Sequence, residues 1–242
     1  MISTENAAGQ LYVDKDQLLA LESDPPLRHD SPSNFNILAG YTIPILNYIR
    51  RNETDVVIGA DKSGRLFTTA LSGMWHELFP LEAFPTAAGD VQFAQLSVPE
   101  REEAPGFRYV AKQRLDQIVA PVRESVRATT ERDRLQVLFV DSYMKNGRTK
   151  YLVADLLSGT DVDVHFAAMW DSKFEPVPAD VYGNVDGLPK MSAGGMAGST
   201  DIGFDYLSSG ELIDTPTRES NDNYRRINLA VRRVSKIVQV RE

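Results

Sequence analysis

The chain has 242 residues, of which 42% are hydrophobic, so it can bury a full core as one domain, or as one domain with a small appended cap. No apolar run approaches the roughly 20 residues of a membrane span, and the first residues form no signal-like segment, so we expect a cytoplasmic protein without membrane contact. The net charge of -8 argues against nucleic-acid binding, and the lack of cysteine excludes disulfides and cysteine nucleophiles. The three histidines are far apart, so a metal held by protein groups alone is not expected.

The first part of the chain combines a polar arm with a helical pattern. Residues 1–33 are polar and contain prolines, which predicts a loosely held arm with one short helix around Asp16 to Leu21. From Asn34 to Arg51, apolar residues recur at spacings of three and four, as in an amphipathic helix. Pro44 falls inside this pattern, so either a kinked helix or two helices are expected.

A strand, a polar turn and a helix come next. Asp55 to Gly59 reads as a short buried strand, and a helix is predicted from about Leu66 to Phe79. This order is the start of a βαβ unit and predicts a parallel sheet. Residues 84–110 mix turn formers and charges without periodicity, which indicates either a functional loop or a hairpin. Helical pattern resumes from about Tyr109 to Thr129.

Val137 to Thr149 carries the clearest chemical signal in the chain. Four apolar residues predict a strand buried on both faces, and Asp141 lies where that strand should end. Asn146 and Gly147 suit a tight turn with positive φ, and Thr149 opens a helical stretch. The N-terminus of a helix favours a bound phosphate, and an acid at the strand tip can hold ribose hydroxyls.

The remaining elements complete the sheet and add a C-terminal helix. Val162 to Trp170 predicts the next strand, and the segment Ala179 to Gly183 follows it. Ser192 to Thr200 is rich in glycine but lacks the lysine of a nucleoside-triphosphate loop, so a surface loop is expected. The C-terminal helix has an apolar face made of Tyr224, Ile227, Val231, Val234 and Val238. Its basic face is expected to meet solvent, with a subunit interface or an acidic partner as alternatives.

The run from Val137 to Thr149 resembles the phosphoribosyl-pyrophosphate (PRPP) binding motif of the type I phosphoribosyltransferases. That motif consists of an apolar strand, two acidic residues, a short loop ending in Thr-Gly, one further residue and a threonine. Three positions match its first acid, its loop glycine and its closing threonine, in that order: Asp141, Gly147 and Thr149. Three positions depart from its second acid and its small hydroxyl residues: Ser142, Lys145 and Asn146.

A second stretch resembles the pyrophosphate loop of the same family, in the form seen in adenine phosphoribosyltransferases. Gly59, Asp61 and Gly64 match its Gly-apolar-acid-x-x-Gly pattern, while Lys62 and Arg65 supply cations that a pyrophosphate favours. Two matches in the order in which the family has them support the resemblance more strongly than either match alone. The family also has a flexible loop in the interval corresponding to residues 84–110.

The resemblance implies an α/β fold, a doubly wound parallel sheet of about five strands with helices on both faces and a small hood. Residues 34–183 would form the phosphoribosyltransferase-like core. Residues 1–33 would form an N-terminal arm, and residues 184–242 a C-terminal hood or extension with the amphipathic helix.

The implied reaction transfers phosphoribosyl from PRPP, which carries Mg²⁺, to a nitrogenous base, purine-like or another 6-oxo base, with release of pyrophosphate. Asp141 would be the catalytic residue and would hold the ribose together with Ser142. The 5′-phosphate would lie on Lys145, Asn146, Gly147, Arg148 and Thr149. Pyrophosphate would lie on Asp61, Lys62, Ser63, Gly64 and Arg65. Lys173, which follows a predicted strand, would read the base, although a solvated surface lysine is the alternative.

Ser142 leaves a second interpretation open. It is either an ordinary turn residue or a degraded catalytic position, because serine cannot ionise as the second acid would. The alternative to an enzyme is therefore a non-catalytic regulatory protein that binds PRPP or a nucleotide. Both interpretations imply small-molecule partners, no nucleic acid and no membrane, and both allow a homodimer.

Overall fold

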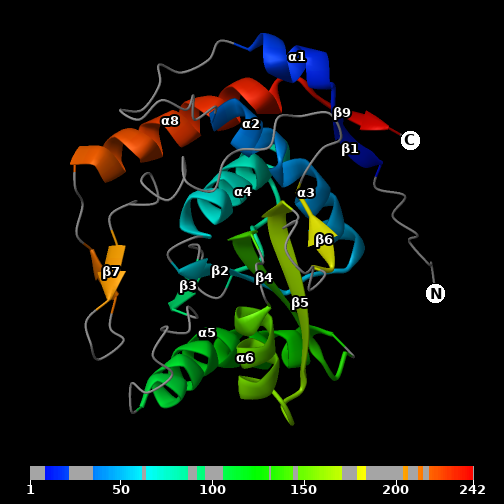
Figure 1. Cartoon of the computed structure of the whole chain (residues 1–242). Helices are drawn as coiled ribbons and strands as arrows, with labels where there is room; N and C mark the ends of the chain where they lie inside the picture. Colours follow the sequence, from blue (N-terminus) through cyan, green and yellow to red (C-terminus); the bar gives the residue numbers. More distant parts are fainter. Residues whose placement is uncertain are drawn as a thin grey trace, which may run out of the picture.

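The computed structural model describes residues 9–21, 35–61, 64–86, 92–95, 106–130, 132–143, 147–170, 179–183, 204–206, 212–214 and 218–241 (Figure 1). Its centre is a five-stranded, all-parallel sheet in the order β3-β2-β4-β5-β6. The five strands are β2 (Val56–Asp61), β3 (Gln92–Gln95), β4 (Leu135–Tyr143), β5 (Val162–Trp170) and β6 (Val181–Tyr182). The predicted parallel α/β sheet of about five strands is confirmed.

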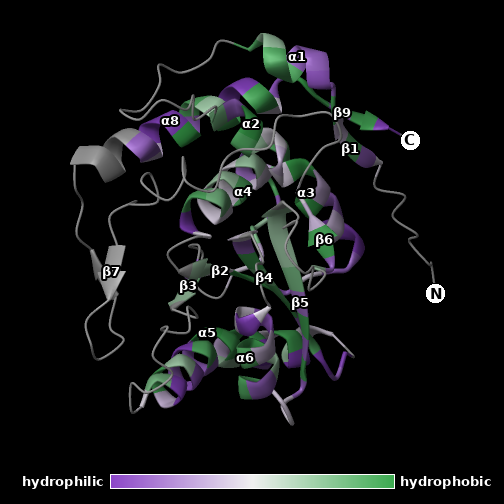
Figure 2. Cartoon of the chain, viewed as in Figure 1, coloured by the Kyte–Doolittle hydropathy of each residue, from purple (hydrophilic) through white to green (hydrophobic). Residues whose placement is uncertain are grey.

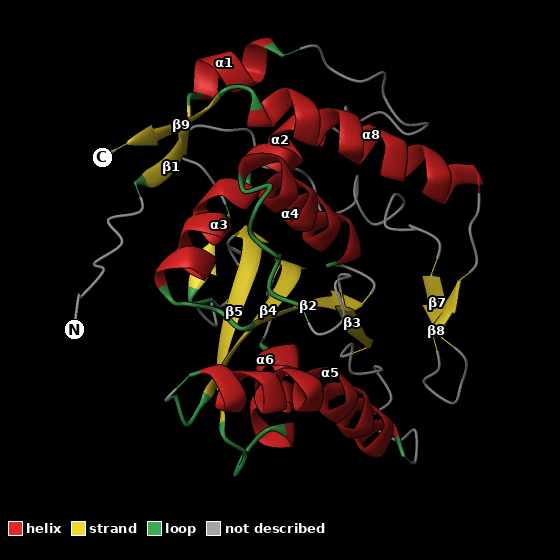
Figure 3. Cartoon of the chain, turned by 180° about the vertical axis from the view of Figure 1, so that it is seen from behind, coloured by secondary structure: helices red, strands yellow, loops and turns green. Residues whose placement is uncertain are grey.

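Helices cover both faces of the sheet, an arrangement compatible with a doubly wound fold (Figures 1 and 3). One face carries α2 (Phe35–Gly40), α3 (Thr42–Arg51), α4 (Arg65–Leu78) and α8 (Arg218–Ser235). The other face carries α5 (Phe107–Thr129) and α6 (Arg148–Leu156). In Figure 2 these helices show alternating hydrophobic and hydrophilic stretches, as expected where one side of a helix packs on a sheet.

The alternation of side chains along each strand explains the two cores. Side chains that pack with α2, α3, α4 and α8 are Val57, Leu138, Val140, Ala167 and Met169. Their neighbours in sequence point to α5 and α6: Val56, Ile58, Val137, Phe139, Phe166 and Ala168. Val137 to Val140 in β4 and Phe166 to Met169 in β5 are apolar runs buried on both faces of the sheet, which is why the sequence predicted these two strands well.

Two small antiparallel pairs lie outside the central sheet. β1 (Gln10–Val13) pairs with β9 (Val238–Arg241), so the two ends of the described chain meet beside α1 (Lys15–Ala20) (Figure 1). β7 (Phe204–Tyr206) pairs with β8 (Leu212–Asp214).

The structure refines several local predictions. The pattern from Asn34 to Arg51 forms two helices, and Pro44 lies in the first turn of α3, where a missing N–H is tolerated. Strand β3 lies within the interval for which a loop or hairpin was predicted. Val238 was predicted to be helical, which is wrong, because it pairs with Val13 in the antiparallel ladder. The glycine-rich stretch 192–200 lies outside the described residues.

Candidate functional site

The order of the strands places a switch point between β2 and β4. The chain leaves β2 through α4 to reach β3 on one side, whereas it leaves β4 through α6 to reach β5 on the other side. The two connections therefore diverge at the carboxyl ends of β2 and β4. In open α/β sheets, ligands bind in the crevice that opens at such a point.

Gly64 lies on one side of this switch point, between β2 and α4. Its backbone N–H donates to the carbonyl of Ala60 at 2.8 Å, which closes the turn between β2 and α4. A Cβ atom on Gly64 would lie 2.4 Å from the Val140 carbonyl oxygen and 2.8 Å from that of Ala60. Only glycine fits here, because any side chain would meet the backbone of both β2 and β4.

Thr68 lies one turn into α4 and fixes the Gly64 carbonyl. The Thr68 N–H donates to that carbonyl at 2.8 Å, and its hydroxyl donates to the same oxygen at 2.7 Å. Below it, Gly59 has no room for a side chain, because a Cβ atom there would lie 2.8 Å from Thr68 Oγ1 and 2.6 Å from a ring carbon of Phe93. Strands β2 and β3 and helix α4 thus meet in a tightly packed layer under the crevice.

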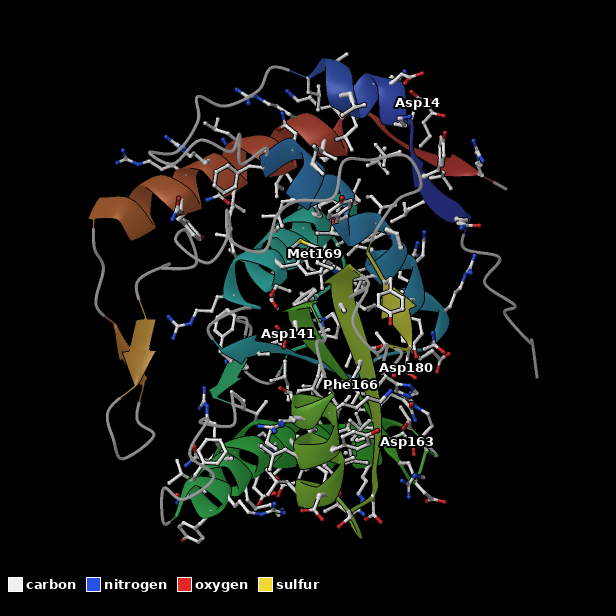
Figure 4. The ribbon with its side chains drawn as sticks, in the orientation of Figure 1. Asp14, Asp141, Asp163, Phe166, Met169 and Asp180 are labelled. Atoms are coloured by element: carbon white, nitrogen blue, oxygen red, sulfur yellow. The ribbon has the colours of Figure 1, made fainter. Side chains whose placement is uncertain are left out.

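Asp141 and Ser142 lie on the other side of the switch point, at the end of β4. The Ser142 N–H donates to Asp141 Oδ1 at 2.7 Å, which orients the carboxylate. Ser142 is 6% exposed, whereas Asp141 is partly exposed. Figure 4 shows Asp141 in the middle of the molecule, close to β3 and β4.

Gly147 begins helix α6 in the left-handed conformation, with φ of 68°, so the predicted positive φ at this residue is confirmed. Its carbonyl accepts the first helical hydrogen bond, from Tyr151 N at 2.9 Å. Arg148 is exposed and Thr149 is partly exposed in the first turn.

The starts of α4 and α6 share an electrostatic property. Neither Gly64 nor Gly147 can supply a side-chain cap, and the first turn of each helix contains no acidic residue. A helix start without a capping side chain keeps backbone N–H groups and a positive dipole end for an anion. Two anion-favouring helix starts therefore lie at the same edge of the sheet, which also carries the Asp141 carboxylate.

The structure brings together several of the predicted site residues. Gly64, Asp141, Gly147, Arg148 and Thr149 all lie at the carboxyl ends of β2 and β4. Arg65, the first residue of α4, is also here but is only 1% exposed. Asp61 ends β2, where its backbone is paired with Gln95 of β3. The predicted residues Lys62, Ser63, Lys145, Asn146 and Lys173 lie outside the described residues.

The segment from Ala179 to Gly183 forms the edge of the sheet. Asp180 Oδ2 accepts from the Phe166 N–H at 2.7 Å, and the ammonium of Lys150 lies 3.8 Å from the same oxygen. A Cβ atom on Gly183 would lie 2.4 Å from the Tyr41 carbonyl oxygen. Asp180 thus fastens β6 to β5.

The amino end of the sheet holds a chain of polar side chains. Tyr48 OH lies 2.9 Å from His165 Nδ1, and His165 Nε2 lies 3.0 Å from Gln136 Oε1. The Gln136 amide donates to Asp163 Oδ2 at 2.9 Å, and Arg134 Nε donates to Asp163 Oδ1 at 2.7 Å. Asp163 lies low on β5 in Figure 4, away from Asp141.

The pKa shifts of Asp163 and Tyr48 in this network of polar side chains follow from their contacts. Hydrogen bonds from Arg134 and Gln136 hold the pKa of Asp163 below its ordinary value. Burial raises the pKa of the Tyr48 phenol, and the negative charge of Asp180 raises it further. Tyr48 therefore stays protonated at neutral pH.

A hollow of about 660 Å³ lies near the amino end of β2. Arg50, Glu53, Trp75 and Glu82 are among the residues that line it. Arg50 is paired with Glu82 at 3.6 Å and stacks over the Phe79 ring at 4.3 Å, which accounts for its charge. None of the residues that line this hollow lies at the switch point between β2 and β4.

Sequence reasoning missed Thr68 and Phe93, which support the crevice from below. Thr68 stands four residues after Gly64, a spacing that allows a hydroxyl to reach back to a helix carbonyl, so a signal was present. Phe93 had no such signal, because β3 is short and its packing depends on pairing with β2.

No family model matches the chain, and a search of curated proteins found no significant match. Within the described ranges, no group of three or more metal-ligating side chains comes together. The helices in the part of the chain that the structure describes are all too short or too polar to cross a membrane.

Proposed function

We propose that this chain binds PRPP at the crevice between β2 and β4 and transfers its phosphoribosyl group to a nitrogenous base, as a type I phosphoribosyltransferase. One observation carries the proposal: two glycine-started helices, α4 and α6, flank a switch point that also carries Asp141. The motif matches at Gly59 to Gly64 and at Asp141 to Thr149 support the same assignment.

PRPP suits such a crevice because it carries two anionic groups on opposite sides of a ribose. The start of α6 would hold the 5′-phosphate through backbone N–H groups and Thr149. The start of α4 would hold the pyrophosphate. Asp141, on the strand between these two helix starts, would accept hydrogen bonds from the ribose hydroxyls.

In the proposed reaction, the bond between the ribose C1 and the pyrophosphate oxygen breaks, a nitrogen of the base bonds to C1, and the proton of that nitrogen passes to the leaving pyrophosphate or to water. Positive charge develops on the ribose while pyrophosphate leaves as the complex with the Mg²⁺ that accompanied PRPP. The role of the protein is to position the substrates and to stabilise these charges. Asp141 is the negative group nearest to the ribose in this scheme.

The second candidate is a regulatory protein that binds PRPP or a nucleotide without turnover. Ser142 favours it, because the family motif has a second acid at this position and a buried serine provides no charge for the developing cation. The pyrophosphate-type turn favours the enzyme over a sensor of nucleoside monophosphates, because such a ligand carries no pyrophosphate to occupy the turn.

Two assays separate the candidates. Calorimetric titration with PRPP and Mg²⁺ should show binding in both cases. A pyrophosphate-release assay across purine and other 6-oxo bases should then show turnover only for the enzyme. PRPP binding without turnover would favour the regulatory protein, and absence of binding in titrations with PRPP and with nucleotides would rule out both candidates.

A further inference from the structure

We infer that Thr68 is the positioning residue for pyrophosphate, an inference that rests on the proposed function. The Thr68 hydroxyl does not touch the ligand in this account. It holds the Gly64 carbonyl, and with it the first turn of α4, in the orientation that pyrophosphate requires.

The Gly64 peptide is held on three sides. Its N–H donates to Ala60, its Cα lies against the Val140 carbonyl, and its own carbonyl accepts two hydrogen bonds from Thr68. Three of these contacts come from the backbone. The Thr68 hydroxyl is the one contact that a side chain supplies, so it is the one that substitution can remove.

Thr68 is fully buried, so its hydroxyl needs a hydrogen-bond acceptor within the protein. Its relative exposure is 0%, and its Oγ1 fills the space that a side chain on Gly59 would otherwise occupy. A buried hydroxyl that lost its acceptor would pay a desolvation penalty, so its contact with Gly64 holds tightly. The Gly64 carbonyl is therefore oriented before any ligand arrives.

Thr69 provides a matched comparison on the same helix. Its hydroxyl donates to the Arg65 carbonyl at 2.8 Å, with the same spacing of four residues. Hydroxyl groups that bond back along a helix are common and by themselves indicate no function. Thr68 differs because its acceptor is the residue that closes the turn at the crevice.

The test uses the full chain and two separate probes, inorganic pyrophosphate with Mg²⁺ and ribose 5-phosphate. Calorimetric titration of Thr68→Val should show pyrophosphate binding about tenfold weaker than in the wild type, as expected when one orienting hydrogen bond is lost. Its affinity for ribose 5-phosphate should not change, because that probe would bind at α6. Thr68→Ser keeps the hydroxyl and should restore pyrophosphate binding.

Thr69→Val is the control, and it should bind both probes as the wild type does. Equal pyrophosphate affinity in Thr68→Val and the wild type would overturn the inference while leaving the proposed function in place. Equal weakening of both probes would also overturn it, because that result indicates a general loss of structure. If the wild type binds neither probe, the proposed function fails and the inference fails with it.

Discussion

The two ends of the central sheet use polar groups in opposite ways. At the amino end, side chains bond to one another from Tyr48 through His165, Gln136 and Asp163 to Arg134. At the carboxyl end, glycines start α4 and α6 without side-chain caps, beside Asp141. Polar side chains that hydrogen-bond to one another stabilise the fold and specify its packing. Helix starts without side-chain caps instead favour an anion from outside the protein. The comparison indicates that the amino end helps to hold the fold together, and the carboxyl end is where we propose that the ligand binds.

Gly64→Ala should give the largest effect. It should lower the stability of the fold and also remove ligand binding at the carboxyl end of the sheet. The added methyl would meet the carbonyls of Val140 and Ala60, so we expect the free energy of unfolding to fall by about 2 to 3 kcal/mol. Pyrophosphate binding should be lost as the turn moves. Urea unfolding and calorimetry measure the two effects.

Gly159→Ala is the control for that substitution. Unlike Gly64, Gly159 has a positive φ, of 73°, and its Cβ position is open, so only a backbone strain of about 1 kcal/mol is expected. Ligand binding should be unchanged. A Gly64→Ala protein that is as stable as the wild type and binds pyrophosphate normally would contradict the close approach described above.

Asp141→Asn should mainly affect binding. The amide can still accept from the Ser142 N–H, so the fold should keep its stability. The ribose hydroxyls would lose a charged acceptor, which corresponds to about 2 kcal/mol, or roughly 30-fold in PRPP affinity. Unchanged affinity, measured by calorimetry, would show that Asp141 does not hold the ribose.

Tyr48→Phe should affect only the amino end. It removes the partner of His165 Nδ1, and we expect a loss of about 1 kcal/mol in unfolding free energy. PRPP binding should be the same as in the wild type. A large loss of affinity in this variant would mean that the two ends are not functionally separate.

Asp163→Asn should give the smallest effect, and one that depends on pH. Because its pKa is lowered in the folded protein, Asp163 contributes stability above the ordinary carboxyl pKa, and that contribution is lost as pH falls through the lowered value. The side chain is 38% exposed, so we expect no more than about 0.5 kcal/mol near pH 7. The wild type and the variant should converge in stability below about pH 4. Urea titrations at a series of pH values test this, and a constant difference at all pH values would contradict it.

The parts of the fold that sequence predicted well are those set by local pattern. Strand β5 was predicted from Val162 to Trp170, as observed, because its second half contains the apolar run Phe166 to Met169, which is buried on both faces. The positive φ at Gly147 followed from turn chemistry. The helix Tyr109 to Thr129 was found within two residues as α5.

The parts that escaped prediction depend on partners far away in sequence. β1 and β9 exist because the two ends of the chain pair with each other, and neither segment is distinctive alone. β3 has four residues, two of them glutamine, and is a strand because it pairs with β2. In the site, Gly64 was a motif match, but its contact with Val140 on β4 could not be read from residues so distant.

A structure determined with PRPP and Mg²⁺ tests the central claim most directly. The account predicts the 5′-phosphate at the start of α6, the pyrophosphate at the start of α4, and the ribose hydroxyls on Asp141. A ligand bound instead in the hollow lined by Arg50 and Glu82 would contradict the assignment of the two ends of the sheet. So would a crevice between β2 and β4 that stays empty at saturating PRPP.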